Sequence, residues 1–92
     1  MPEIHFSIQW PDGEITRCYS PSTIVREYFS RDLTLTIEEL VETSTRALGA
    51  AGDRVEAKYG FACTSAAAEL RNIQVRAGSF SAEEKVTIVD ID

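Results

Sequence analysis

The opening segment of the chain alternates strictly between apolar and polar side chains, from Ile4 to Trp10. A period of two residues is typical of a strand with one buried face. Phe6 and Ile8 are therefore expected to face a core together with Ile4 and Trp10, while His5 lies on the opposite face. We expect this first strand to lie in the middle of a sheet, between its hairpin partner and the last strand of the chain.

A hairpin turn is predicted directly after this strand, at Pro11-Asp12-Gly13. Proline presets φ at the first turn position, aspartate suits the second, and glycine takes the left-handed conformation that follows. This chemistry favours a three-residue loop with a bulge at Gly13, which places Trp10 opposite Glu14.

The register of the hairpin decides on which face the first cysteine lies. The three-residue loop pairs Phe6 with Cys18 on the core face and His5 with Tyr19 on the other face. A two-residue loop would pair Ser7 with Cys18 instead and move Cys18 to the solvent side, because a slip of one residue reverses every side chain. The turn chemistry favours the first register.

A first helix is predicted after the hairpin, with Ser20 as its N-cap and Pro21 in its first helical position. We interpret residues 30–35 as a polar connection from this helix to the next one. The inner face of the helix is expected to consist of Ile24, Val25, Tyr28 and Phe29.

The second predicted helix is long, and a capping box of Thr36 and Glu39 marks its start. Glu42 and Arg46 lie at i and i+4 on its outer face, where they are expected to form an ion pair. The small residues at 47–52 are expected to let a neighbouring helix approach closely. Apolar and small positions recur at helical spacing and predict an inner face of Ile37, Leu40, Val41, Ser44, Leu48, Ala51, Val55 and Tyr59.

A third helix is predicted between two glycines, Gly60 as the left-handed stop of the long helix and Gly78 as its own end. Thr64 or Ser65 is expected to cap it. A β-branched strand follows at residues 85–91. The inner face of this third helix is expected to consist of Ala66, Leu70, Ile73 and Ala77.

These elements predict a single α+β domain over residues 1–92, with the order β-β-α-α-α-β. A small, mostly antiparallel three-stranded sheet packs against the helices in two layers. A chain of 92 residues is large enough to bury a core without disulfides.

The net negative charge of the chain argues against two classes of binding partner, nucleic acid and anionic membranes. There are 15 acidic and 9 basic residues, a formal net charge of −6. Binding to phosphate backbones or to an anionic membrane needs a cationic surface, so neither nucleic acid nor a membrane is an expected partner. The N-terminus lacks the pattern of a signal peptide, which predicts a cytoplasmic protein with reduced thiols.

Two cysteines are the candidate reactive groups, Cys63 and Cys18. Cys63 precedes a predicted helix N-terminus, where amide donors lower the pKa of a thiol, and the alternative is a small side chain filling a gap between helices. Cys18 is expected in the core. We predict that both thiols are free.

No catalytic residue, metal site or cofactor is predicted. The cysteines lack the C-x-x-C spacing of zinc ribbons and thioredoxin-like redox sites. The chosen register places His5 and Cys18 on opposite faces, which separates the only histidine from the nearest thiol.

Five short segments of the sequence stand out: Met1-Pro2-Glu3, Trp10-Pro11-Asp12-Gly13, Cys18-Tyr19-Ser20-Pro21-Ser22, Arg54-Val55 and Lys58-Tyr59-Gly60-Phe61-Ala62-Cys63. In this order they resemble a family of small bacterial and cyanobacterial nitrogen-starvation-response proteins, whose genes lie in a cluster with a nitrilase. The resemblance extends from residue 1 to about residue 78 and implies a cytoplasmic role tied to nitrogen scarcity. It implies no catalytic residue.

Three functions are compatible with these observations. The leading hypothesis is a non-enzymatic accessory or regulatory protein that binds a protein partner from the nitrilase cluster. The alternatives are a thiol-dependent or metal-assisted enzyme that uses Cys63, with Cys18 as a second thiol, and a sensor of a small ligand.

Self-association as a symmetric dimer is also expected, because a small sheet leaves edges that must be covered or paired. The expected patch is either the outer edge of the hairpin around Ile15 and Tyr19 or the face of the long helix at residues 47–52. The alternative is that the same surface receives a pathway partner and the isolated protein is a monomer.

Overall fold

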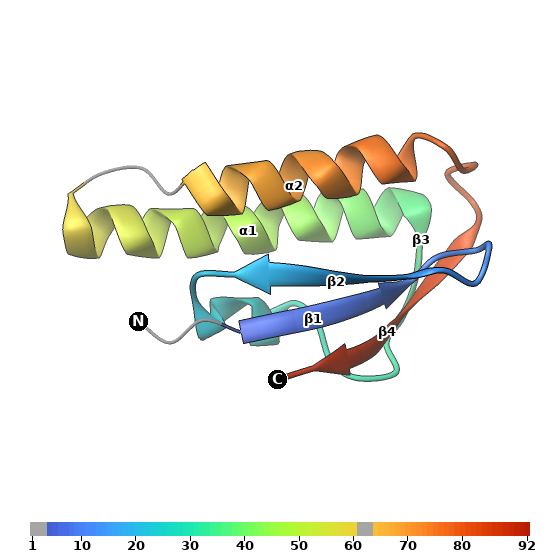
Figure 1. Cartoon of the computed structure of the whole chain (residues 1–92), viewed down its shortest axis with the longest axis horizontal. Helices are drawn as coiled ribbons and strands as arrows, with labels where there is room; N and C mark the ends of the chain where they lie inside the picture. Colours follow the sequence, from blue (N-terminus) through green and yellow to red (C-terminus); the bar gives the residue numbers. More distant parts are fainter. Residues whose placement is uncertain (1–3, 61–63) are drawn as a thin grey trace.

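A four-stranded antiparallel sheet forms one layer of the molecule, and two long helices lie side by side in the other (Figure 1). The computed structural model describes residues 4–60 and 64–92. The sheet has the order β2-β1-β4-β3, so β1 is central and antiparallel to both of its neighbours, as expected for the first strand. The strands are β1 (Ile4–Gln9), β2 (Ile15–Ser20), β3 (Thr34–Thr36) and β4 (Lys85–Ile91).

The hairpin turn between β1 and β2 has the predicted three-residue geometry. The backbone N–H of Trp10 donates to the carbonyl of Glu14 at 2.8 Å, and that of Gly13 donates to the carbonyl of Trp10 at 2.8 Å. Gly13 has a φ of 91°, the left-handed conformation that favours glycine. The turn therefore sets the register that its residue chemistry predicts.

The register confirms the expected faces of the hairpin. Phe6 lies opposite Cys18 and His5 opposite Tyr19. Phe6 and Cys18 are fully buried beneath the helices, whereas His5 is half-buried on the other face of the sheet.

The sheet has one strand more than expected. Thr34–Thr36, in and just beyond the stretch interpreted as a polar connection, forms β3 and pairs with β4, where Leu35 lies opposite Val86. The two threonines that flank Leu35 are β-branched and suit a strand. A run of three residues is too short for its alternation to be distinguished from a connection.

The segment after the hairpin is a single 3₁₀ turn, η1 (Thr23–Glu27), in place of the expected α-helix. Ser22, and not Ser20, is its N-cap, and the Ser22 hydroxyl accepts the N–H of Ile24 at 3.3 Å. Three consecutive β-branched residues, Thr23 to Val25, weaken α-helix formation in so short a segment. Phe29, which follows η1, stacks on Phe6 with ring centroids 5.0 Å apart.

The long helix α1 (Ile37–Tyr59) begins and ends as predicted. The Thr36 hydroxyl accepts the N–H of Glu39 at 3.1 Å, and the Glu39 carboxylate accepts the N–H of Thr36 at 3.0 Å. These hydrogen bonds hold the pKa of Glu39 below its usual range. Gly60 closes the helix with a φ of 81°.

The second long helix, α2 (Thr64–Ala77), includes both residues that were expected to cap it, Thr64 and Ser65. Its N-cap position therefore lies outside the described residues. Gly78 ends it as predicted, with its N–H donating to the carbonyl of Gln74 at 3.1 Å. Neither α1 nor α2, the α-helices within the described ranges, combines the length and apolar character of a membrane span.

Most of the predicted inner positions of α1 and α2 are buried, with three differences. Val41 and Leu70 are only half-buried, and the side chain of Tyr59 is half exposed. Ile24 and Tyr28, predicted inner residues of the segment at η1, are also half-buried. Val41 and Leu70 pack against the edge of the core. The buried core is built around Phe6, Ile8, Phe29, Leu40, Leu48, Ile73, Val86 and Ile88.

Candidate functional site

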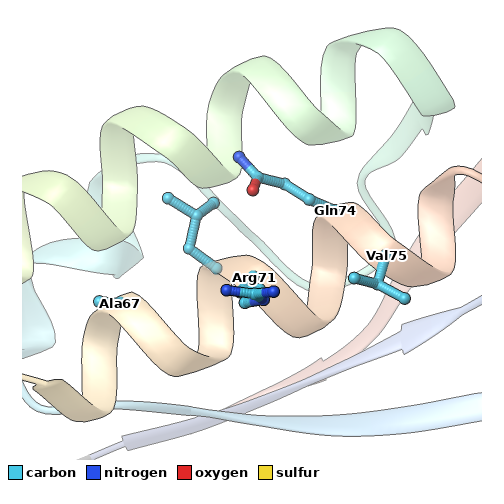
Figure 2. Close-up of a pocket in the computed structure, with 5 residues that line it drawn as sticks. Ala67, Arg71, Gln74 and Val75 are labelled. Carbon is cyan, nitrogen blue, oxygen red and sulfur yellow. The ribbon is translucent and has the colours of Figure 1, made fainter.

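A hollow of about 490 Å³ opens along the outer side of α2. Figure 2 draws its lining residues along α2 and labels Ala67, Arg71, Gln74 and Val75, with the amide of Gln74 directed toward α1. Val75 is 69% exposed, the most exposed of the large apolar side chains that the structure describes. The lining consists of Ala67, Leu70, Arg71, Gln74 and Val75.

Two further hollows adjoin this one, and each shares lining residues with it. The hollow of about 510 Å³ near the start of α1 shares Gln74, and the hollow of about 220 Å³ near the start of α2 shares Ala67 and Leu70. The three hollows, linked along the helical layer by these shared residues, are here called the α1–α2 groove. Its other lining residues are Ile37, Glu38, Val41, Glu42, Leu48, Gly49, Gly52, Asp53, Glu56, Ala66, Ala77, Gly78, Phe80 and Ala82.

Small residues on α1 explain how the sequence builds one end of the groove. A Cβ on Gly52 would lie 3.8 Å from the Cβ of Ala66, so the helices pack there through glycine and alanine. A Cβ on Gly49 would meet no atom within 4 Å. The expectation that residues 47–52 admit a neighbouring helix is confirmed for Gly52, while Gly49 leaves open space.

The two walls of the groove differ in charge. The α1 wall carries the exposed carboxylates Glu38, Glu42, Asp53 and Glu56, and the α2 wall carries Arg71. Glu42 forms the predicted ion pair with Arg46, at 2.8 Å. Within residues 4–60 and 64–92, the other three carboxylates of this wall form no ion pair.

Cys18, one of the two candidate thiols, is enclosed in the core. Its side chain is fully buried, and its Sγ lies 4.0 Å from the carbonyl oxygen of Thr16. Burial raises the pKa of the Cys18 thiol to about 12, and the nearby carboxylate of Glu69 adds to the shift. Cys18 is therefore a protonated, inaccessible thiol at neutral pH. Cys63 lies outside the described residues, so its reactivity stays a prediction.

The segment Cys18-Tyr19-Ser20-Pro21-Ser22 makes the connection from β2 to η1. The backbone N–H of Tyr19 donates to Glu69 of α2 at 3.1 Å, which links the edge strand to the helical layer. The buried hydroxyl of Ser20 donates to the carbonyl of Ser22 at 2.7 Å. These hydrogen bonds give the segment a structural role that accounts for its serines.

The segment Trp10-Pro11-Asp12-Gly13 contacts the end of α2 and the residues that follow it. Trp10 is buried and stacks on Phe80 with ring centroids 5.8 Å apart, and its indole N–H donates to the Thr16 hydroxyl at 2.9 Å. The Arg76 guanidinium lies 5.7 Å from the Trp10 ring centroid and forms an ion pair with Asp12 at 2.9 Å. Arg76 also pairs with Glu14.

The segment Lys58-Tyr59-Gly60 ends α1. The Nζ of Lys58 lies 5.7 Å from the Tyr59 ring centroid, and the Gly60 N–H donates to the carbonyl of Glu56 at 2.7 Å. Phe61 of the same segment lies outside the described residues.

The titratable residues do not converge on one site. The side chain of His5 lies on the open face of the sheet, and its backbone N–H donates to the Asp92 carboxylate at 2.9 Å, while Cys18 lies on the buried face. Among the described residues, no three of the types His, Cys, Asp and Glu are arranged to hold a metal ion.

The groove was not predicted from the sequence, although a signal for it was present. Val41 and Leu70 fit the helical period of a buried face, whereas Val75 falls outside it. Val75 thus adds an exposed apolar side chain to the outer side of α2, next to the half-buried Leu70 in the lining of the hollow. Arg76 and Glu69, which fasten the motif segments, gave no local signal because their partners are 50 to 64 residues away.

Comparison with protein families matches residues 5–91 to the family described as Nitrogen starvation-induced protein NitG. No curated protein and no solved structure matches the chain.

Proposed function

This chain belongs to the family of nitrogen starvation-induced proteins described as NitG, and on that premise we propose that it is a non-enzymatic accessory protein that acts by binding another protein. Its place of action is the cytoplasm of nitrogen-starved cells. Its partner belongs to the pathway of a nitrilase-containing gene cluster, as the resemblance of the motif segments implies.

The observation that carries this proposal is the α1–α2 groove. Its apolar lining includes Val41, Leu70 and Val75, none of which is fully buried. A contiguous apolar surface with a polar rim marks a contact site for another macromolecule. The sheet layer already buries the inner faces of both helices, so the outer surface is available for a partner.

The chemistry of Cys18 supports a binding role over a thiol-dependent one. A nucleophilic thiol needs a lowered pKa and access to substrate, and Cys18 has a pKa of about 12 and no exposed surface. A thiol enzyme would therefore depend on Cys63 alone.

Co-purification tests the proposal. The tagged chain is recovered from nitrogen-starved and nitrogen-replete cells, alongside the variants Ala67→Arg, which fills the groove, and Ala68→Arg. Ala67 and Ala68 are both exposed on α2, but only Ala67 lines the groove. The proposal predicts a stoichiometric protein partner in starved cells that Ala67→Arg loses and Ala68→Arg retains. A chain that recovers no stoichiometric partner would contradict it.

A further inference from the structure

We propose that the α1–α2 groove binds an amphipathic helix of the partner protein, with a row of Lys and Arg residues along one flank. This inference rests on the proposed function and names the chemistry of the partner. The shape of the groove, its lining and its charges each contribute one part of the argument.

The length of the groove suits a helix of several turns. Its α1 wall extends from Glu38 to Glu56, which at about 1.5 Å per residue corresponds to roughly 27 Å. Two adjacent antiparallel helices present a long channel between their outer ridges, and a third helix packs into such a channel at a shallow angle. An occupant of about 18 residues would fill it.

The lining favours a helix over an extended segment. The groove is bounded by helices, whose backbone groups are already hydrogen-bonded, so a strand laid there would find no ladder of partners for its own backbone. A helix satisfies its backbone internally and needs only an apolar stripe. Val41, Leu70 and Phe80 are half-buried in the structure and offer the matching surface.

The charges of the two walls indicate on which side of the bound helix its Lys and Arg residues lie. Glu38, Asp53 and Glu56 line the α1 wall without an ion-pair partner among the described residues, while the α2 wall contributes only Arg71. A helix with Lys and Arg along the side that faces α1 would pair with these carboxylates.

The same charges disfavour a second copy of this chain as the occupant. A two-fold pairing of the groove with itself would bring either two α1 walls together, or each α1 wall against an α2 wall. Each α1 wall carries four carboxylates, and Arg71 is the one cation that the α2 residues lining the groove supply. Like-charge contacts of this kind suppress association. The occupant is therefore a different chain of opposite charge.

Two synthetic peptides test the inference on the intact protein. Both have 18 residues with the same leucine and alanine stripe at helical spacing, and they differ only in flanking Lys or flanking Glu. Fluorescence anisotropy gives the affinity, and amide NMR shifts give the site. We expect the Lys peptide to bind at least ten-fold more tightly, with shifts at Val41, Ala67, Leu70 and Gln74, and Ala67→Arg to abolish binding while Ala68→Arg retains it.

Charge variants of the protein measure how much electrostatic attraction contributes to the affinity for the Lys peptide. Neutralising the unpaired carboxylates of the α1 wall should weaken the Lys peptide about ten-fold, or about 1.4 kcal/mol, and a triple variant elsewhere on the surface should change its affinity less than two-fold. The wall variant combines Glu38→Gln, Asp53→Asn and Glu56→Gln, and the control variant combines Glu27→Gln, Asp32→Asn and Glu83→Gln, all at exposed positions.

Several outcomes would overturn the inference. These are equal affinity for both peptides, no saturable binding of the Lys peptide, NMR shifts confined to the open face of the sheet, or a self-associated chain that Ala67→Arg makes monomeric. If the peptides fail while the chain still recovers a partner from starved cells that Ala67→Arg loses, the assignment of a basic amphipathic helix fails and the proposed function stands. If no partner is recovered, the proposed function itself fails.

Discussion

The Nη2 atom of Arg76 lies 2.9 Å from the Oδ2 atom of Asp12, although 64 residues separate them in the chain. This ion pair joins the turn of the β1–β2 hairpin to the last turn of α2. The hairpin turn thereby fixes the end of one helix that lines the α1–α2 groove. The fold and the candidate binding surface are coupled at this point.

The first prediction concerns this ion pair. Arg76→Gln should destabilise the protein by roughly 1 to 2 kcal/mol, because it removes the pair with Asp12 and the contact of the guanidinium with the Trp10 ring. A double-mutant cycle with Asp12→Asn, followed by urea unfolding, should give a coupling energy of about 0.5 kcal/mol or more.

The matched control for that cycle is Arg46→Gln. Arg46 is also an arginine in an ion pair on a helix, but its side chain is 68% exposed, so the change should cost only about 0.3 kcal/mol. The role assigned to the Arg76–Asp12 ion pair would be contradicted if the stability changes of Arg76→Gln and Asp12→Asn were strictly additive. Equal losses of stability for Arg46→Gln and Arg76→Gln would also contradict it.

The second prediction is a stabilising substitution in α1. Ser44 is fully buried, and its hydroxyl has no hydrogen-bond partner among the described residues. Ser44→Ala removes an unsatisfied polar group and raises helix propensity, so the free energy of unfolding should rise by about 1 kcal/mol. Thr45→Ala, at an exposed neighbour, should stay within about 0.5 kcal/mol of the parent. A loss of stability in Ser44→Ala would refute the assignment.

Much of the fold could be predicted from the sequence, because short local patterns of residues specify it. The Pro11-Asp12-Gly13 turn predicts the hairpin register, and the Thr36–Glu39 capping box predicts the start of α1, both of which the structure confirms. The errors lie where local signals compete. Thr34–Thr36 forms a strand because β4 pairs with it across the sheet, and that partner is about 50 residues away.

The candidate site was harder to predict from the sequence, because it depends on how the two helices pack together. Helical periodicity marks Val41 and Leu70 as inner residues, yet each lies at the border between the core and the outer surface. Only the packing of α1 against α2, close at Gly52 and Ala66, determines which side chains line a depression. The motif segments that the structure describes make structural contacts, and Cys18, one of the two candidate thiols, is buried among them.

The third prediction concerns thiol reactivity. In a Cys63→Ser background, the remaining thiol of Cys18 should not react with a thiol reagent in the native state at pH 8, and should react fully in urea. Its burial and its pKa of about 12 are the reasons. Native-state labelling of Cys18 at the rate of an exposed thiol would show that the core opens around it.

The same pKa has a consequence for stability at high pH. Because the folded-state pKa of about 12 lies above the usual value of 9.0 for a cysteine thiol, the unfolded chain loses this proton first, and stability should fall as the pH rises from about 9 toward 12. Thermal unfolding across this range, compared with Cys18→Ala in the same Cys63→Ser background, isolates the effect. A parallel decline in both proteins would assign it to other groups.

The fourth prediction is self-association through the edge of the hairpin. Ile15 on the edge strand β2 is 59% exposed, which supports a two-fold contact there that leaves the groove open. Light scattering at micromolar concentration should give twice the monomer mass of 10.2 kDa, and Ile15→Lys should return the monomer. The monomer mass across a dilution series of the parent protein would exclude the dimer.

Site-specific photo-crosslinking in nitrogen-starved cells tests the central claim most directly. A photo-reactive amino acid replaces Val75, which lines the groove, or, as a control, the exposed Glu27 in η1. The account predicts that position 75 crosslinks to one protein partner, that starvation increases the product, and that position 27 gives none. Absence of a crosslink from position 75, or the same products from both positions, would contradict the account.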